Sequence, residues 1–191
     1  DYHGTMERYE ASKAALFHRV GLSAAIVNAD DAAGRRLISS LPAGLVRAYA
    51  LDDASAAGLA AGLAAIRARD VHSTAQGQMF TLVMPQGEAQ VITRLLGGHN
   101  VYNLLLVAGV LSALGFPLAQ IAQRLAEAEP VDGRMQIVDR VAGLTIAGPL
   151  VVVDYSHTPD SLERALVALR PVAQARGGRL VCVFGCGGER D

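Results

Sequence analysis

The chain has 191 residues, of which 51% are hydrophobic and 18% are charged, and its formal net charge is −1. This length allows one large domain or parts of two, and the hydrophobic content is sufficient for a real core. The neutral charge balance, without a basic run, argues against nucleic acid or an anionic membrane as the main partner. The longest apolar run, 104–118, is shorter than the roughly 20 residues that span a bilayer.

The cysteines and the N-terminal segment indicate a reducing compartment. The number and spacing of Cys182 and Cys186 suit neither a zinc site nor a disulfide framework. The opening sequence DYHGTMER is polar and differs from a signal sequence. Because the chain starts without Met and stops just after a strand-like run, we expect it to be an internal fragment of a longer protein.

In the first half of the chain, apolar periodicity and turn residues predict alternating helices and strands. Helices are expected over 5–19, 31–40 and 54–69, and strands over 24–31, 46–53, 78–85 and 88–96. Gln86 and Gly87 separate the last two strands. Since glycine supplies the positive φ of a tight turn, these two strands should form a hairpin.

The second half begins with the glycine-rich turn GGHN, in which Asn100 is a candidate N-cap. Helices are expected over 101–115, 118–128 and 159–175. A connector is expected over 130–138, and buried strands are expected over 149–155 and 178–185. Thr158 or Asp160 can start the last helix. The order β-α-β predicts a right-handed parallel crossover, and the change in composition predicts a domain boundary near 136–139.

Lys13 is the only lysine in the chain. At about 100° per helical residue it lies within an apolar stripe, whose other members are Met6, Tyr9, Leu16 and Phe17. Low-dielectric surroundings lower the pKa of an amine and so favour its neutral form. A lysine within such a stripe is therefore a candidate functional residue. Two alternatives stay open: a lysine that extends from the stripe to water, and an arginine-rich coding bias that spared one lysine by chance.

Polar residues follow the two strands expected in the second half. Because ligands bind at the carboxyl ends of strands in doubly wound sheets, Asp154, His157 and Asp160 are candidate ligand contacts. In the structural alternative, Asp160 caps the next helix and His157 is a surface turn residue. The segment FGCGGERD fits a dinucleotide fingerprint except at Arg190, which argues against a nicotinamide-dependent oxidoreductase. The sequence also contains no P-loop motif G-x-x-x-x-G-K-[ST], since Lys13 is the only lysine and does not follow such a glycine.

Six motifs resemble, in their order along the chain, those of the Mur ligase family: DYHGTMERYEASKAALF, AIVNADD, GGHNVYNLLL, GRMQIV, VVVDYSHTPDSLERAL and VFGCGGERD. The similarity covers essentially the whole chain and is closest to the tripeptide-forming type. Ser156 stands where the family usually has Ala, a change that we expect not to matter. The resemblance implies an α/β fold in which 1–137 is the C-terminal portion of the central ATP-binding ligase domain. Residues 138–191 would then start a Rossmann-like C-terminal domain with its first βαβ unit.

The resemblance also implies an ATP-dependent amide ligase of peptidoglycan synthesis. Such enzymes phosphorylate a carboxylate of UDP-N-acetylmuramoyl-L-Ala-D-Glu, and the amine of a third, diamino, amino acid then attacks the acyl phosphate. Both meso-diaminopimelate and lysine stay open as that amino acid. We expect a cytoplasmic monomer that uses ATP and Mg²⁺, has no nucleic acid or membrane partner, and is inactive as a fragment because the P-loop and the UDP-binding domain lie elsewhere. The alternative is a non-catalytic Mur-like nucleotide-binding module, which would have no need of Lys13.

The resemblance implies a set of site residues by position. The lysine that Lys13 matches is carbamylated by CO₂, which gives an anionic oxygen ligand suited to Mg²⁺, so Lys13 is the catalytic and metal-binding candidate. The candidates for ATP binding are Asn100 and Asn103 near the adenine, Arg134 at the phosphates, and Asp154, Tyr155 and His157 on a loop that closes over the nucleotide. The residues read as surface, without a family role, are Arg47, Asp70 and His72.

Overall fold

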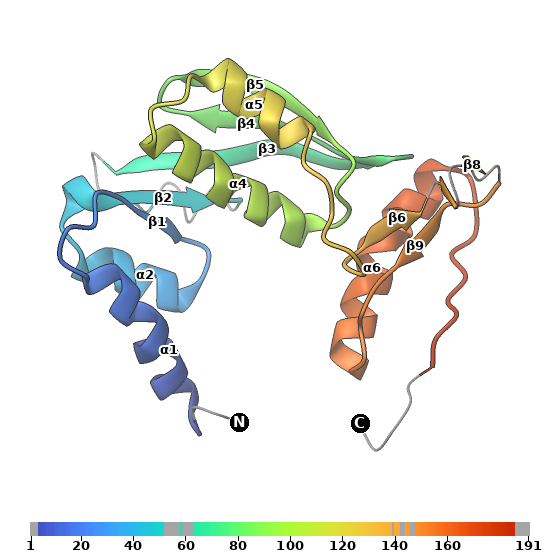
Figure 1. The fold of residues 1–191 in the computed structure, drawn as a ribbon, viewed down its shortest axis with the longest axis horizontal. Coiled ribbons are helices and arrows are strands. Elements are labelled where there is room, and N and C mark those ends of the chain that lie inside the picture. Colours follow the sequence, from blue (N-terminus) through green and yellow to red (C-terminus); the bar gives the residue numbers. More distant parts are fainter. Residues whose placement is uncertain are drawn as a thin grey trace.

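The described residues form a larger lobe around a five-stranded sheet and a smaller lobe around one long helix (Figure 1). This computed structural model describes residues 4–51, 58, 63–138, 140–141, 144–145 and 148–185. Among these residues, no helix combines the length and the apolar character needed to cross a membrane.

The sheet of the larger lobe is mixed. Its strands, in spatial order, are β1 Ala25–Asn28, β2 Val46–Ala50, β3 Ala64–Thr74, β4 Gly77–Met84 and β5 Gly87–Thr93. The first three strands run parallel, and β3, β4 and β5 form an antiparallel meander. The predicted hairpin is confirmed, with Met84 opposite Gly87 at the turn. The parallel half places the carboxyl ends of β1 and β2 at one edge of the sheet, where ligands commonly bind.

The helix predicted over 54–69 is wrong from residue 64 onward, where β3 begins. Most of the residues before 63 in that segment lie outside the described residues. Alanine favours helices, but burial in β3 alternates with the period of a strand, because Ile66 and Ala68 are buried and Arg67 between them is only partly so. Packing of Ile66 into the core therefore outweighs helix propensity.

The described part of the larger lobe contains the α-helices α1 Met6–Ala14, α2 Ala32–Ser40, α4 Gly98–Ala113 and α5 Leu118–Ala126, with short 3-10 turns at Ala15–His18 and Ala43–Leu45. These helices confirm the corresponding predictions, although the last turn of the first predicted helix tightens into the 3-10 form. The prediction of Asn100 as N-cap is wrong. Gly97, with φ of 85°, occupies that position, and Asn100 lies inside the first turn of α4.

The main core lies between the sheet and the helices α4 and α5, which run along it in Figure 1. α4 presents one buried face to the sheet, made by Val101, Leu104, Leu105 and Ala108. α5 adds Ile121 and Leu125, and the sheet contributes Phe80, Leu82 and Val91. This contiguous packing fixes α4 against the strands, which matters below because α4 carries two of the predicted site residues.

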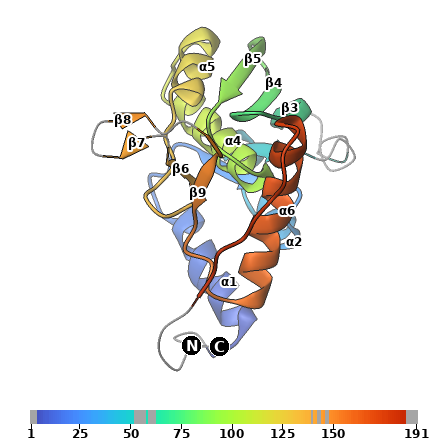
Figure 2. The ribbon, with the colours of Figure 1, turned by 90° about the vertical axis from the view of Figure 1, so that its right-hand side faces the viewer.

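The smaller lobe consists of α6 Pro159–Ala175 beside short antiparallel strands, as Figures 1 and 2 show. The paired strands are β6 Gln136–Val138 with β9 Val151–Val153, and β7 Arg140–Val141 with β8 Leu144–Thr145. A small core of Leu96, Met135 and Val172 joins the lobes, because Leu96 follows β5 of the larger lobe and Val172 belongs to α6.

The parallel crossover predicted for the smaller lobe is not formed by the described residues. Strand β9 pairs antiparallel with residues 136–138, which the sequence analysis treats as a connector, and Val151 and Val153 are exposed rather than fully buried. Residues 178–185 form no strand, and Val183 is 96% exposed. A buried parallel strand needs neighbours at its edges and layers on both faces, and the described residues provide neither around this segment.

Candidate functional site

The loop between β9 and α6 is tied to the segment before β6 by the carboxylate of Asp154. Its Oδ2 accepts a hydrogen bond from the backbone N–H of Met135 at 2.9 Å. Its Oδ1 accepts one from the backbone N–H of Ser156 at 2.9 Å and a second, short one from the Ser156 hydroxyl. Both oxygens of this half-buried carboxylate are therefore engaged by protein donors.

These contacts change the acidity of Asp154. Partial burial raises the pKa of its carboxyl, but this effect is outweighed by hydrogen bonds from the Ser156 side chain and from the backbone of Met135 and Ser156, together with the charge of Arg134. The net result is a pKa below the ordinary value of 3.8. Asp154 is consequently an anion at neutral pH.

Arg134, Tyr155 and His157 form one continuous exposed surface beside this carboxylate. The guanidinium carbon of Arg134 lies 5.2 Å from the centroid of the Tyr155 ring, within the range of a cation–π contact. The rings of Tyr155 and His157 meet edge to face with centroids 5.3 Å apart. His157 Nδ1 donates to the carbonyl of Tyr155 at 3.0 Å. The structure thus brings together four of the predicted site residues, including Asp154.

The turn that carries Arg134 has an unusual backbone. Gly133 and Met135 on either side of it both have positive φ, 70° and 47°. A non-glycine residue rarely adopts this region, so Met135 stores some backbone strain. Met135 is buried while Arg134 is exposed, so the left-handed residue turns one side chain into the core and directs its neighbour towards solvent.

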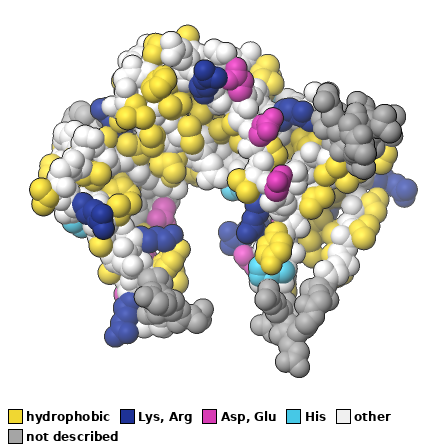
Figure 3. Space-filling model, in the orientation of Figure 1, with side chains coloured by type: hydrophobic (Ala, Val, Ile, Leu, Met, Phe, Trp, Pro, Cys, Tyr) yellow, Lys and Arg dark blue, Asp and Glu magenta, His cyan; other side chains and the backbone are white. Residues whose placement is uncertain are grey.

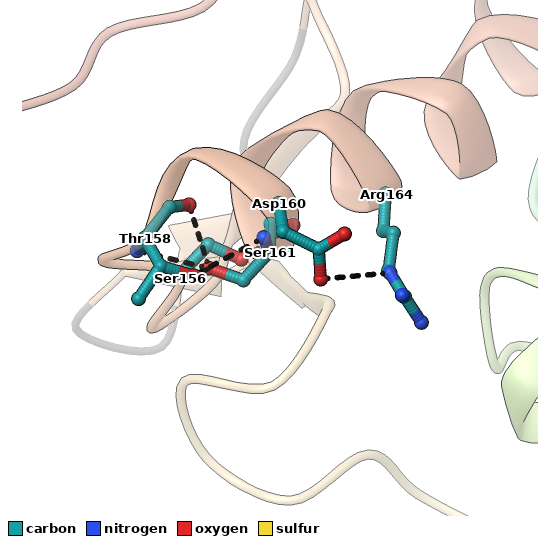
Figure 4. Close-up of polar contacts among 5 residues, drawn as sticks. All are labelled: Ser156, Thr158, Asp160, Ser161 and Arg164. Atoms are coloured by element: carbon teal, nitrogen blue, oxygen red, sulfur yellow. Dashed lines mark hydrogen bonds and ion pairs between the residues drawn. The ribbon is translucent and has the colours of Figure 1, made fainter.

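The N-terminus of α6 fixes the other end of the loop (Figure 4). Thr158, one of the two residues predicted to start the helix, is the N-cap and forms a reciprocal capping box with Ser161. The Ser156 hydroxyl also lies 3.1 Å from the carbonyl oxygen of Ser161. Asp160 neither caps the helix nor joins this cluster, because it forms an ion pair of 3.0 Å with Arg164 on the exposed side of α6.

Asn100 and Asn103 form a short chain of hydrogen bonds on α4. Asn100 Nδ2 donates to the carbonyl of Leu96 at 2.8 Å, and Asn103 Nδ2 donates to Asn100 Oδ1 at 3.1 Å. Leu96 in turn shares the small core with Met135, whose N–H binds Asp154. The asparagine pair is therefore connected through Leu96 to the segment that carries the rest of the cluster.

Lys13 does not have the low-dielectric surroundings that the sequence predicts. No residue of α1 is buried, and Met6 and Leu16 of the supposed stripe are 65% and 57% exposed. The Lys13 ammonium is exposed and lies 4.4 Å from the centroid of the Tyr9 ring. Of the stripe, Phe17 is partly buried and packs against the cluster of Ala25, Val27, Leu41 and Val46.

Lys13 instead lines a cleft of about 1060 Å³ between α1 and the β1–α2 segment. An ion pair of 2.5 Å between Glu10 and Arg36 links the two helices across it. α1 and α6 lie on opposite sides of the molecule in Figure 1, and the space-filling view shows open space between them (Figure 3). Lys13 is thus separated from the cluster around Asp154.

The described residues do not form a complete metal centre by themselves, since no group of three or more His, Cys, Asp or Glu side chains converges among them. The exposed amine of Lys13, on the wall of an open cleft, has room for carbamylation. A carbamate is a hard oxygen donor of the kind that Mg²⁺ prefers. Lys13 therefore fits the role of one ligand.

Two readings of individual residues need correction. Arg47 is partly buried within β2 rather than on the surface, and its Nε finds no hydrogen-bond partner among the described residues. Ser156, which the sequence analysis treats as neutral, contacts the predicted site residue Asp154 directly. Asp70 and His72 are exposed, as predicted. The Ser156 contact could have been anticipated from its position two residues after a strand-terminal Asp, where hydroxyl turns are common.

Comparison with known proteins decides the family. The sequence profile of the Mur ligase middle domain matches residues 1–111, more than half of the chain. The chain belongs to the Mur ligase family. A second profile, described as Mur ligase, glutamate ligase domain, matches residues 133–191. The Asp154 cluster lies within the second matched segment, whereas Lys13, Asn100 and Asn103 lie within the first.

Relatives within the Mur ligases include two curated proteins named UDP-N-acetylmuramoyl-L-alanyl-D-glutamate--2,6-diaminopimelate ligase. Those of Xanthomonas campestris pv. campestris (strain 8004) and Ralstonia nicotianae (strain ATCC BAA-1114 / GMI1000) are 49% and 48% identical over the whole chain. The chain spans 36% of the length of each. A solved structure of a ligase with the same name is 32% identical with a TM-score of 0.71, covering all of this chain and 36% of the solved one.

Proposed function

We propose that the chain is an internal part of an ATP-dependent ligase that joins 2,6-diaminopimelate to UDP-N-acetylmuramoyl-L-alanyl-D-glutamate in peptidoglycan synthesis. The observation that carries this proposal is the 49% identity, over the entire chain, to a curated ligase of that name. Because the chain spans 36% of that relative, the complete activity also depends on parts of the enzyme other than these residues.

The proposed reaction has two steps. A carboxylate oxygen of the dipeptide attacks the γ-phosphorus of ATP, which forms an acyl phosphate and releases ADP. The amine of diaminopimelate then attacks the acyl carbon, the carbon–oxygen bond to phosphate breaks, and an amide, inorganic phosphate and a proton result. An acyl phosphate hydrolyses readily, so the residues around it must exclude water as well as bind the nucleotide.

The cluster around Asp154 supports a nucleotide site in the smaller lobe. Arg134 offers a planar, permanently charged donor that suits phosphate oxygens. Tyr155 and His157 extend this surface with exposed rings. Asp154 acts by position, because its oxygens hold the loop to Met135 and Ser156. We propose that this loop closes over the nucleotide, as lids do in many ligand-binding enzymes.

Asn100 and Asn103 are proposed to face the adenine. A carboxamide carries both a donor and an acceptor, which matches the mixed polar edge of a base. Asn103 is exposed, and the hydrogen bond to Asn100 Oδ1 uses one of its two N–H donors. Its carbonyl oxygen and second N–H are thus available for a base edge.

The proposed domain division places 1–137 in the central ligase domain and 138–191 in the C-terminal domain. Two features support a boundary near this point: the two family profiles match 1–111 and 133–191, and the left-handed turn at Gly133 and Met135 precedes β6. A hinge needs a few residues that absorb changes in φ and ψ. We propose that this turn is the hinge of loop closure.

Lys13 is proposed to be carbamylated and to serve, in that form, as one ligand of Mg²⁺. When bound, Mg²⁺ would neutralise charge on the transferred phosphoryl group. Arginine cannot replace lysine here, because a permanently protonated guanidinium does not react with CO₂. This property gives a chemical reason for the single lysine of the sequence.

Phosphate release by the full-length enzyme tests the proposal. We expect release to require ATP, the UDP-muramoyl dipeptide and diaminopimelate together, with lysine as the matched alternative amino acid.

His157→Ala should raise the KM for ATP several-fold, because His157 belongs to the exposed loop and not to the core, and should leave the thermal unfolding temperature nearly unchanged. ATP binding without phosphate release would instead indicate a non-catalytic nucleotide-binding module.

A further inference from the structure

A polar anchor at the carboxyl end of β1 connects the sheet to the start of α4. The hydroxyl of Tyr102 donates to Asp30 Oδ2 at 2.7 Å, and the backbone N–H of Leu51 donates to the same oxygen at 2.6 Å. Asp30 and Tyr102 are 72 positions apart in sequence. Their contact therefore depends on the fold, and neither residue has a role in the site described above.

Asp30 is itself held firmly in place. Its backbone N–H donates to Asn28 Oδ1, and its carbonyl oxygen accepts from the guanidinium of Arg35, each at 2.9 Å. The same Arg35 nitrogen also donates to the carbonyl of Ala29 at 2.9 Å. A carboxylate whose own backbone is fixed on both sides provides a rigid reference point for a partner on another element.

The start of α4 is held against the sheet by its buried residues Val101, Leu104 and Leu105, and Tyr102 adds a directional polar contact to this packing. At about 100° per residue, Tyr102 lies on roughly the opposite side of α4 from Asn100, and Asn103 follows at the next position. A bond at Tyr102 therefore adds to the packing of the buried face and helps to fix the direction in which both asparagines point.

A small rotation would be costly for a bound base. A side-chain atom about 6 Å from the helix axis moves by about 1 Å when the helix turns by about 10°. Displacements of this size are sufficient to break hydrogen-bond geometry and to lower the efficiency of an enzyme severely. Fixing the rotation of α4 is thus a functional requirement as well as a structural one.

We infer that Asp30 and Tyr102 are positioning residues that set the rotation of α4 and thereby direct Asn100 and Asn103 towards the adenine of ATP. This inference rests on the proposed function, since it assigns a purpose to the two asparagines. It goes further in naming a carboxylate–phenol pair, outside the nucleotide site, that controls nucleotide affinity without touching the nucleotide.

Tyr102→Phe in the full-length enzyme is the direct test. It keeps the ring and removes the hydroxyl that binds Asp30. We expect the KM for ATP to rise about tenfold, the equivalent of one hydrogen bond to a charged group, while kcat and the KM for the dipeptide substrate change by less than about twofold. A selective rise in the KM for ATP distinguishes positioning from a general loss of stability.

Ser112→Ala is the matched control. Its hydroxyl accepts a hydrogen bond of 2.9 Å from Gln86 Nε2, which links the opposite end of α4 to the β4–β5 turn. This variant also removes one hydroxyl that connects α4 to the sheet. We expect it to leave the KM for ATP unchanged, because the end of α4 distant from the asparagines is affected.

Asn103→Ala separates the inference from the proposed function. If Asn103→Ala leaves the KM for ATP unchanged, the proposed role of the asparagines is wrong. If Asn103→Ala raises it but Tyr102→Phe does not, or if Tyr102→Phe only lowers the unfolding temperature, the positioning inference alone is overturned. The double variant should raise the KM for ATP by less than the product of the two single effects, because both act through one contact.

Discussion

Lys13 is the residue whose surroundings differ most from the prediction. Met6 and Leu16 of the apolar stripe are exposed, and the Lys13 ammonium contacts the ring of Tyr9. Burial by the described residues therefore does not explain the proposed carbamate. The observed side chain fits the alternative that the sequence left open, a lysine that reaches water. Activity measurements on variants of Lys13 distinguish this alternative from a metal ligand.

Replacement of Lys13 in the full-length enzyme provides that distinction. Lys13→Ala should fold normally, because alanine favours helices and no buried contact is lost. Its kcat should fall on the order of 10²–10³-fold, the cost of losing a charged contact in phosphoryl transfer. Lys13→Arg should fail equally, and removal of CO₂ should reduce wild-type activity reversibly. Full activity of Lys13→Arg would contradict carbamylation, and Arg8→Ala on the same helix serves as the control.

Ser156→Ala tests the support of Asp154. The pKa of Asp154 is lower in the folded protein than its ordinary value of 3.8. The ionised carboxylate therefore stabilises the folded state fully at pH values above that ordinary pKa. This contribution is lost as the pH falls through the lower pKa of the folded state. Removing the Ser156 hydroxyl should cost about 1 kcal/mol of unfolding free energy at pH 7. The deficit should shrink as Asp154 becomes protonated.

Urea unfolding at a series of pH values measures this dependence. Ser39→Ala is the matched control, because the Ser39 hydroxyl donates to the carbonyl of Arg35 at 3.0 Å. Its effect on stability should be independent of pH across the acidic range. A deficit of Ser156→Ala that stays constant as Asp154 is protonated would show that the hydroxyl contact with Ser161, and not the one with Asp154, is the important one.

At the scale of the elements, α2 approaches β1 so closely that a side chain does not fit between them. A Cβ atom on Gly34 would lie 1.9 Å from the backbone oxygen of Asn28. Gly34→Ala should therefore destabilise the protein by about 1–3 kcal/mol through overpacking, despite the better helix propensity of alanine. Thermal or chemical unfolding of the variant measures this loss.

Gly98→Ala in the first turn of α4 is its counterpart. No atom lies within 4 Å of a Cβ at that position. The same substitution should there be neutral or stabilising by up to about 1 kcal/mol. Equal destabilisation by both variants would mean that the loss at Gly34 does not come from the contact with Asn28.

The elements also indicate how far the sequence allows prediction. Helices with clear caps and periodicity, such as α6 with Thr158, were predictable because their signals are local. The helix prediction fails over 64–69, the first part of β3, because the alanines there carry a helical preference that sheet packing overrides. The run 178–185 was predicted as a strand from its β-branched residues, but a strand forms only where partner strands are available.

The candidate site was predictable to a different degree. The resemblance suggested Arg134, Asp154, Tyr155 and His157 together, and the structure does place them side by side. Their roles remain predictions. The contact of Asp30 with Tyr102 could not be predicted, because it joins residues distant in sequence and depends on how α4 packs. The polar end of the AIVNADD strand was the only local signal.

For the molecule as a whole, we predict that the isolated chain has no ligase activity. The sequence contains no P-loop motif, and the chain spans 36% of its curated relatives. Purified chain, mixed with ATP, UDP-muramoyl dipeptide and diaminopimelate, should release no phosphate above a blank, whereas full-length enzyme should do so under the same conditions. Release by the chain itself would mean that it holds a complete phosphoryl-transfer site.

The small core of Leu96, Met135 and Val172 has a consequence for how the molecule opens. Leu96 is 0% exposed and Val172 is 1% exposed, and each is covered by the other lobe as well as its own. Detaching α6 would expose both, so local fraying of the smaller lobe is coupled to loosening of the turn before α4. Amide protons at the start of α4 and in the middle of α6 should therefore exchange with solvent through one shared cooperative opening, with a common free energy of opening, rather than as two independent units.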